Sequence, residues 1–417
     1  MDLTLVVEII LVFASIMFIH ELGHFIFAKR AGIFVREFSL GLGPKLLSVK
    51  KGETQYSLRI LPFGAYVRMA GEDPEVIEIK KGDQIGVNLN QKGEVTDIFS
   101  EGKKGEKRIQ VEEIDLEHEL IIKGMDENEQ FVQYKVARNT ILHYEKQNVQ
   151  IAPWDRQFGS KSILDRFLTV FAGPLFNILL TIVLFFIVFN MVGVPSNQVI
   201  LGEITPNSPA AKAGLQEGDW VLSINGQAVE SSQEFINFIQ HSPNQELNLI
   251  VNRKGIEKTI TIVPQLDQKA KVGKIGAVVT QAQKEATIGE AASYSVKNTL
   301  AMTKVILDGF KLILTGNVGM NDLAGPVGIM KITSDAAKQG LATLLNWAAI
   351  LSLYLGIFNL LPIPALDGSR LMFLTIEGLR GKPIDPKKES LVHLIGFAFM
   401  MLLMIVVTVN DVSRIFD

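Results

Sequence analysis

The stretch MDLTLVVEIILVFASIMFIHELGHFIFAKR, residues 1–30, decides the class of fold. It contains an apolar run long enough to cross a bilayer, which takes about 20 residues. Acidic Asp2 and Glu8 stand where a secretory signal would be basic, and no small-residue cleavage site follows the run. We therefore expect a retained transmembrane helix over residues 1–30.

The composition of the whole chain is typical of a membrane protein. Of the 417 residues 47% are hydrophobic, and the mean hydropathy is +0.25, which is high for a soluble protein. The net charge of −3 is small and both signs are interspersed, so we expect no nucleic-acid partner. The chain has no cysteine, which excludes disulfides, thiolate ligands and cysteine nucleophiles. Any metal ion must be bound by His, Asp or Glu.

Apolar segments predict four transmembrane helices. They fall at residues 1–30, 165–194, 341–380 and 391–410. Lys and Arg cluster after the first segment, before the second and between the last two. By the positive-inside rule these flanks are cytoplasmic, and both termini and residues 195–340 are expected on the outer side.

The polar parts of the chain differ in pattern. Residues 38–69 mix apolar residues with glycine and proline and alternate like strands, which indicates a membrane-associated β-hairpin. Residues 75–150 are charged with short alternating runs, which indicates a soluble β-rich cytoplasmic insertion of unassigned role. Residues 286–340 carry apolar residues at helical spacing with charges on another face, and we expect interfacial amphipathic helices.

The run SPAAKAGLQEGDWVLSINGQAV, residues 208–229, resembles a PDZ domain of the bacterial protease type. The elements SPA, AGL, GD and ING occur in that family's order. We therefore expect an extracytoplasmic PDZ-like α+β domain over residues 199–265. With the four spans, the hairpin and the insertion, the predicted fold class is a membrane α-helical protein.

His20, Glu21 and His24 form an HExxH motif on the first apolar helix. Residues four apart share a helix face, so both imidazoles can bind one zinc ion while Glu21 acts as a base. The alternative is a set of polar residues that only line a helix bundle. Ionisable side chains inside a span are costly and usually functional, which favours the metal site.

A catalytic zinc ion normally has three protein ligands, so a third is needed. The other histidines lie in polar segments or at the start of the last span, and we expect ordinary surface or interfacial roles for them. They are His118, His143, His241 and His393. Asp367 lies in NLLPIPALDG, residues 359–368, where prolines break the third span. Its depth in the cytoplasmic leaflet matches that of the HExxH motif; capping the following helix is an alternative, compatible role.

Together these features resemble the site-2 protease family, of the bacterial type with one extracytoplasmic PDZ domain. The resemblance covers nearly the whole chain, and includes FAGPLFN at residues 171–177 and GPVGI at residues 325–329. It implies an intramembrane zinc metalloprotease of the bacterial plasma membrane, with its active site towards the cytoplasmic leaflet.

The resemblance also implies roles for single residues. It implies that Zn2+ is bound by His20, His24 and Asp367. Glu21 is implied as the catalytic base, Asn359 as a residue that holds the substrate backbone, and Asn177 as a further substrate-binding residue. The hairpin is expected to offer a strand edge to an unwound substrate near Gln55–Ile60.

The expected substrates are single-span proteins already trimmed by another protease, cut for the second time in regulated intramembrane proteolysis. They are anti-sigma factors, cell-division proteins or signal-peptide remnants. The PDZ-like domain is expected to act as a size filter, with peptide binding as the alternative. Two other functions remain open from the sequence: a membrane-anchored PDZ scaffold, and a metal-ion transporter.

Overall fold

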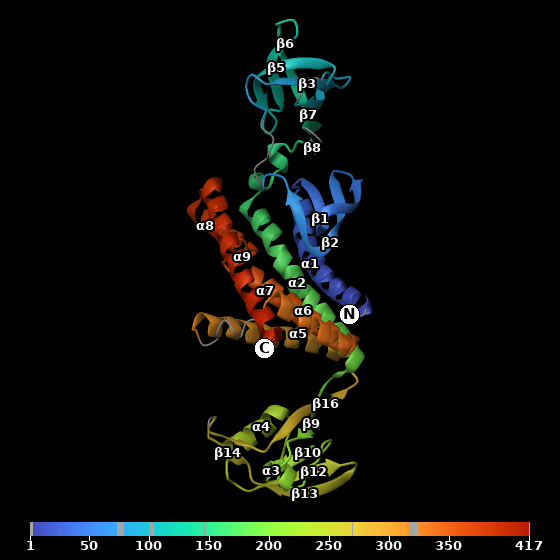
Figure 1. Ribbon diagram of the computed structural model, residues 1–417, viewed down its shortest axis with the longest axis vertical. Helices are drawn as coiled ribbons and strands as arrows, with labels where there is room; N and C mark the ends of the chain where they lie inside the picture. Colours follow the sequence, from blue (N-terminus) through green and yellow to red (C-terminus); the bar gives the residue numbers. More distant parts are fainter. Residues whose placement is uncertain are drawn as a thin grey trace. The chain divides into compact units, whose positions relative to one another are not determined.

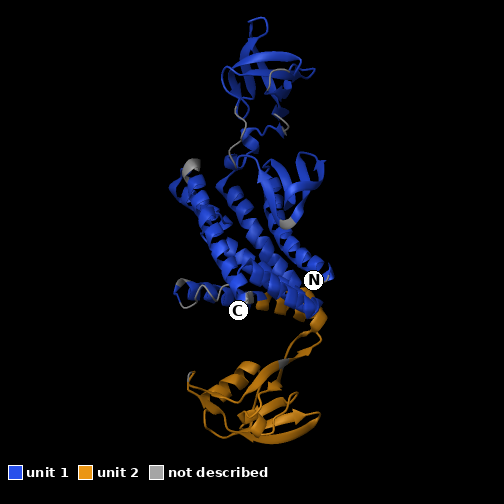
Figure 2. Ribbon diagram, in the orientation of Figure 1, with its two compact units in different colours: residues 1–184, 299–417 blue, residues 185–298 orange. Residues whose placement is uncertain are grey.

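The computed structural model describes residues 3–72, 79–100, 104–144, 147–268, 270–316 and 324–416. Two compact units are distinguished in Figure 2. The first comprises Met1–Leu184 with Thr299–Asp417, and the second comprises Phe185–Asn298. The first unit contains the candidate site, and the second is a separate β-rich domain.

Four helices of the described chain are long and apolar enough to cross a membrane, judged by length and composition (Figure 1). They are α1 (Leu3–Arg30), α2 (Ile163–Val192), α7 (Leu341–Asn359) and α9 (Pro386–Phe416). All four fall on the segments expected from the sequence. The segment expected to be amphipathic contains α5 (Ile288–Leu314) and α6 (Pro326–Lys338).

The helices α1 and α2 approach each other closely beside the HExxH motif. A Cβ atom built on Gly23 would lie 2.3 Å from the carbonyl oxygen of Ala172. Any larger residue at this position would push the helices apart. Nearer the N-terminus of α1, Val12 and Ile16 pack in one buried cluster with Leu344 of α7. Thus α1 is fixed against both neighbours.

The GPVGI segment has a structural explanation. Asp411 on α9 is buried, and its carboxylate accepts hydrogen bonds from the N–H groups of Gly325 (3.1 Å) and Gly328 (2.8 Å) at the start of α6. Free N–H groups at a helix N-terminus favour a negative charge. A Cβ on Gly325 would lie 2.7 Å from this carboxylate, so glycine leaves the room that Asp411 occupies.

The hairpin consists of β1 (Val35–Lys51) and β2 (Thr54–Met69), and both strands fold back on themselves. Residues 37–40 of β1 have partners on two sides, at 65–68 and at 55–58. Residues 55–58 also pair with 47–50. Gly41 permits the sharp bend, because its φ is +90°.

This pairing corrects the expectation that substrate adds beside Gln55–Ile60. Residues 55–58 already have a neighbour on each side, so they have no free edge. Ala65–Met69 pair on one side only, with Val35–Leu40. The free edge within the described hairpin that lies next to the site is therefore Ala65–Met69.

The expected insertion forms a six-stranded sheet in the order β4-β3-β5-β6-β7-β8, and the pairing of β4 with β7 closes it. Its strands are β3 (Gln84–Leu89), β4 (Val95–Phe99), β5 (Lys107–Asp115), β6 (Ile121–Asp126), β7 (Phe131–Tyr144) and β8 (Gln147–Gln150). Inward-facing Ile85, Val87, Ile98 and Ile122 are fully buried and form its core.

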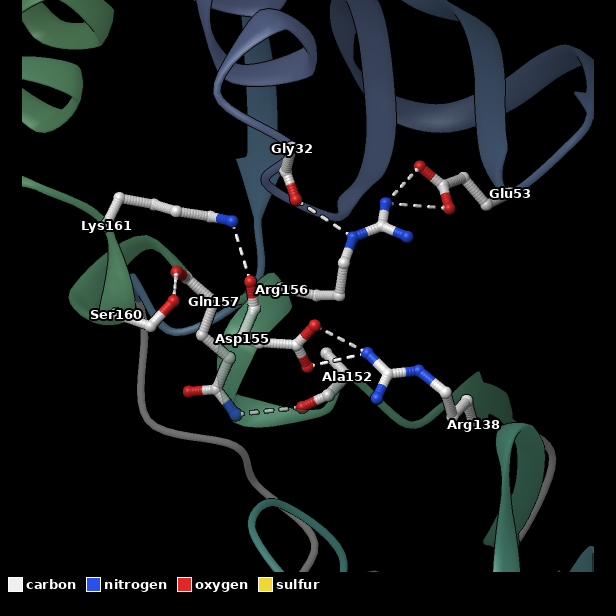
Figure 3. Close-up of polar contacts among 9 residues, drawn as sticks. All are labelled: Gly32, Glu53, Arg138, Ala152, Asp155, Arg156, Gln157, Ser160 and Lys161. Carbon is white, nitrogen blue, oxygen red and sulfur yellow. Dashed lines mark hydrogen bonds and ion pairs between the residues drawn. The ribbon is translucent and has the colours of Figure 1, made fainter.

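Two short 3₁₀ turns, Trp154–Arg156 and Phe158–Ser160, lead from the insertion into α2. Figure 3 shows how Arg156 fastens this connection: its Nε donates to the carbonyl of Gly32 (2.9 Å), just after α1. The same guanidinium donates to both carboxylate oxygens of Glu53, at 2.8 and 3.0 Å, between the two hairpin strands. One arginine thus ties together the end of α1, the hairpin and the start of α2.

The second unit contains a sheet in the order β13-β12-β10-β9-β16, with β11 paired to β10. Its strands are β9 (Val194–Ile204), β10 (Trp220–Ile224), β11 (Gln227–Ala228), β12 (Leu247–Arg253), β13 (Ile256–Ile262) and β16 (Ala277–Lys284), with a separate pair β14 (Gln265–Asp267) and β15 (Val272–Lys274). Helices α3 (Pro209–Lys212) and α4 (Ser232–His241) complete it, and Phe235 lies in its core.

This domain is longer than the expected 199–265. Its sheet begins at Val194 and closes with β16, which pairs along β9 and ends at Lys284. The local alternation of residues cannot reveal that two strands so far apart in sequence are neighbours. The PDZ-like motif covers only the middle of the folded domain.

Candidate active site

The HExxH motif lies in the last third of α1, where His20 and His24 are only 7% and 8% exposed. One turn of helix separates them, and their Nε2 atoms are 3.3 Å apart. Glu21 lies beside them and lines the same cavity. The two imidazoles therefore direct their Nε2 atoms towards the same position.

Asp367 completes this group from the other end of the chain. After α7 ends at Asn359, the chain breaks at two prolines and restarts as α8 (Asp367–Arg380). The Asp367 Oδ2 lies 3.2 Å from His20 Nε2 and 3.5 Å from His24 Nε2. Leu366 occupies the helix N-cap position, which corrects the alternative that Asp367 caps α8.

The three donor atoms fit a zinc ion. In a tetrahedral site the ligands lie about 2.0–2.1 Å from the ion, which puts them about 3.3–3.4 Å from one another. The observed separations of 3.2, 3.3 and 3.5 Å match this spacing. Two imidazoles and one carboxylate are also the donors that catalytic zinc prefers. Among the described residues, these three form the single group of this kind.

The helix α2 supports both histidines from behind. The Nδ1 of His24 lies 2.8 Å from the carbonyl oxygen of Thr169, and the Asn177 amide lies 3.2 Å from Nδ1 of His20. A Cβ built on Gly173 would lie 2.2 Å from His24 Nε2, so only glycine leaves room for that ring. The FAGPLFN segment thus contributes a space and a hydrogen-bonding group.

No role was predicted for Thr169, Gly173 or Gly23 from the sequence. The closely spaced small residues of FAGPLFN were the available signal, since small residues let transmembrane helices approach each other. The expectation for Asn177 needs correction. Its side chain is fully buried between helices, contacts His20, and does not line the cavity.

A cavity of about 380 Å³ opens in front of the three donor atoms. Asn359 lines it, at the end of α7, as does the free edge of the hairpin. The lining comprises Met17, His20, Glu21, His24, Tyr66, Val67, Met69, Glu72, Val170, Leu355, Asn359, Ala365, Leu366, Asp367 and Arg370. An extended peptide lying along Ala65–Met69 would therefore enter the cavity that the donor atoms line.

Two contacts hold the loop that leads into Asp367. Ala365 adopts a φ of +74°, which is strained for a residue with a Cβ. Its N–H donates to Nδ1 of His393 on α9, at 3.2 Å. Beside it, a Cβ on Gly396 would lie 2.0 Å from Cβ of Pro364, so α9 packs tightly on the loop. His393 is therefore a contact of the site loop and not an ordinary interfacial histidine.

Arg370, one turn after Asp367, forms an ion pair with Glu72, which follows the hairpin edge by three residues. Both side chains line the cavity. The pair joins the helix that begins with Asp367 to the chain that extends the hairpin edge.

The remaining histidines have partners of their own. His143 contacts Asp97 and Asn148, at 2.8 Å each. The ring of His118 packs at a tilt of 38° against that of Trp154, and His241 contacts a carbonyl of its own helix. None of the three belongs to the donor group found among the described residues.

Comparison with known proteins identifies a family match over most of the chain. The profile described as "Peptidase family M50" matches residues 8–403. The zinc metalloprotease RasP of Geobacillus kaustophilus is 43% identical over 416 residues, which covers 99% of this chain and 98% of that protein. The regulator of sigma-W protease RasP of Bacillus subtilis is 42% identical over 416 residues, which covers 99% of this chain and 99% of that protein.

Among solved structures, the PDZ domain of the SdrC-like protein from Listeria monocytogenes is similar to a part of the chain. The identity is 27% and the TM-score is 0.19, over 21% of this chain and 94% of that chain.

Proposed function

Because this chain belongs to peptidase family M50 and is a zinc metalloendopeptidase, we propose that it hydrolyses peptide bonds within transmembrane segments of other membrane proteins. In this proposal the zinc ion is held by His20, His24 and Asp367. The observation that carries it is the convergence of these three side chains on α1 and α8, with Glu21 beside them.

Glu21 is the catalytic base. A zinc ion in this site would polarise the scissile carbonyl and make a water molecule more acidic. The Glu21 carboxylate takes the proton of the attacking water and later delivers it to the leaving amine. No side-chain nucleophile is required, in keeping with a chain that has no cysteine. Neither metal-ion transport nor a PDZ scaffold would give Glu21 a purpose.

The substrate helix must unwind before its carbonyl can be attacked, because a helix satisfies its backbone groups internally. The free edge Ala65–Met69 can pair with the unwound segment by strand addition. Asn359 lines the same cavity and can both donate to and accept from the substrate backbone.

The distribution of basic residues supports one orientation of the chain across the membrane. Basic residues flank the cytoplasmic ends expected for α1, α2 and α9, which favours a topology with both termini and the PDZ-like domain outside. The site then lies towards the cytoplasmic leaflet. Exposed apolar side chains on the hairpin agree with its association with the membrane. They include Leu42, Leu46, Leu47, Val49, Ile60 and Leu61.

The substrates in this proposal are single-span proteins whose outer domain another protease has removed. Anti-sigma factors are the first class to test, because one relative is named a regulator of sigma-W protease. The PDZ-like domain would act as a size filter. Deletion of residues 194–284 should then permit cutting of untrimmed substrates, whereas slower cutting of trimmed substrates alone would favour peptide recruitment.

The test of the function uses purified protein in vesicles with a trimmed single-span substrate. Glu21→Gln should lower turnover by about 10²–10⁴-fold, the usual contribution of a general base, while zinc content stays at the wild-type level. Asp367→Ala should lose both zinc and activity, because two ligands are too few. His118→Ala is the control histidine. Retained turnover in Glu21→Gln, or full zinc content in Asp367→Ala, would contradict the proposal.

A further inference from the structure

The two histidines of the donor group stand in matching surroundings. Each directs Nε2 towards Asp367 and turns Nδ1 towards α2. Behind His24, the partner is the carbonyl oxygen of Thr169, at 2.8 Å. A carbonyl can only accept, so Nδ1 of His24 carries the hydrogen and Nε2 is free to bind a metal ion.

Behind His20, the partner is the Asn177 amide, with Nδ2 placed 3.2 Å from Nδ1. The two ends of an amide have nearly the same shape, so the hydrogen-bond network decides which end is which. At its other end, Asn177 Oδ1 is buried with no hydrogen-bond partner among the described residues. No other described contact therefore fixes the orientation of this amide, and the requirement of His20 decides it.

A neutral histidine that binds a metal ion through Nε2 carries its hydrogen on Nδ1 and needs an acceptor there. We propose that Asn177 presents Oδ1, not Nδ2, to His20 Nδ1–H, and is the positioning residue that orients this ligand as Thr169 orients His24. The inference rests on the proposed zinc site. It replaces the substrate-binding role expected for Asn177 with a role in holding His20.

The backbone around Asn177 is fixed independently of His20. Its carbonyl oxygen accepts from the hydroxyls of Thr181 and Ser352, each at 2.9 Å. A Cβ on Gly356 would lie 3.2 Å from Cβ of Asn177, so α7 packs directly against this position. The backbone of Asn177 is thus held in place from α7 while its side chain contacts His20 on α1, which is the arrangement that a rigid support for a ligand needs.

The test compares zinc affinity of full-length variants by competition with a chelator in detergent. Asn177→Leu keeps the branched shape and removes the acceptor, and should weaken zinc binding by about 10–100-fold, the usual effect of losing such a partner. Its turnover should recover as zinc is raised. Asn177→Asp keeps an acceptor oxygen and should bind zinc like the wild type. Asn190→Leu changes an asparagine on the same helix that contacts the Phe186 carbonyl, and should change nothing.

Equal affinity in Asn177→Leu and wild type would overturn the inference, and so would Asn177→Asp binding as weakly as Asn177→Leu. If Asn177→Leu does not fold, the comparison of Asn177→Asp with the wild type decides alone. Failure of the proposed function itself would give a different result. In that case His20→Ala would bind zinc as tightly as the wild type.

Discussion

The N–H of Ala365 donates to Nδ1 of His393 at 3.2 Å, which ties the chain two residues before Asp367 to the last helix. Ala365 holds a φ of +74°, a conformation that costs of order 1–3 kcal/mol and persists only when its surroundings fix it. Through this contact α9 reaches the loop before Asp367, although it contributes no residue to the donor group.

Loss of the His393 acceptor should loosen the loop. A typical hydrogen bond contributes about 1 kcal/mol, so His393→Leu should lower kcat by roughly fivefold or more. His393→Asn retains an acceptor and serves as the comparison. Steady-state cleavage and zinc content would be measured for both. Unchanged kcat in His393→Leu would mean that Pro364 and its packing on Gly396 suffice to hold the loop.

Gly173→Ala should disrupt the proposed zinc site. The added methyl group would lie 2.2 Å from His24 Nε2 and displace the ring. Overpacking of this kind costs about 1–3 kcal/mol. Zinc content and turnover should fall together, while Gly309→Ala, with nothing within 4 Å of its new methyl group, should behave as wild type. Normal zinc content in Gly173→Ala would show that α2 can move away.

The Arg370–Glu72 pair should couple in a double-mutant cycle. Arg370→Glu alone places two acids together beside the site and should lower kcat/KM, and adding Glu72→Arg should restore part of the loss. The coupling free energy calculated from kcat/KM of the four proteins should be about 1 kcal/mol or more for this partly buried pair. The exposed pair Lys338–Asp335 should give about 0.5 kcal/mol or less in thermal unfolding. Independent effects of the two changes would remove the pair from any role at the site.

The PDZ-like domain should lose stability in acid through Asp219. Burial raises the pKa of Asp219, but the hydrogen bonds from Arg253 and from the Gln216 N–H, with the charge of Arg253, outweigh burial and hold the pKa below its ordinary 3.8. The stabilisation is therefore present above pH 3.8 and is lost as the pH falls through the folded-state pKa.

Hydrogen exchange of β10 and β12 in the intact protein, corrected for intrinsic rates, measures this effect. Protection should fall below about pH 4 in the wild type. Asp219→Asn should show lower protection that no longer depends on pH in this window. Arg253→Leu leaves a buried carboxylate without its ion pair and should cost about 3 kcal/mol at neutral pH. A wild-type profile in Asp219→Asn would contradict the assignment.

Local patterns in the sequence were sufficient to predict several features of the protein. The four apolar segments follow from length and composition, and the HExxH spacing places two imidazoles on one helix face. Family, zinc dependence and peptidase activity, inferred from these motifs, were confirmed by the match over residues 8–403. Each of these features depends on residues close together in the chain.

Tertiary structure alone decided the rest. The sequence could not show that residues 55–58 are paired on both sides, that β16 closes the second domain, or that His393 holds the loop before Asp367. It also could not show that Asn177 lies behind His20 and outside the cavity. These features depend on which distant segments become neighbours, and periodicity reports only the face that each segment buries. The three proposed ligands could be predicted from the sequence, but the groups that contact them and their loop became visible only when α1, α2, α7 and α9 were packed together.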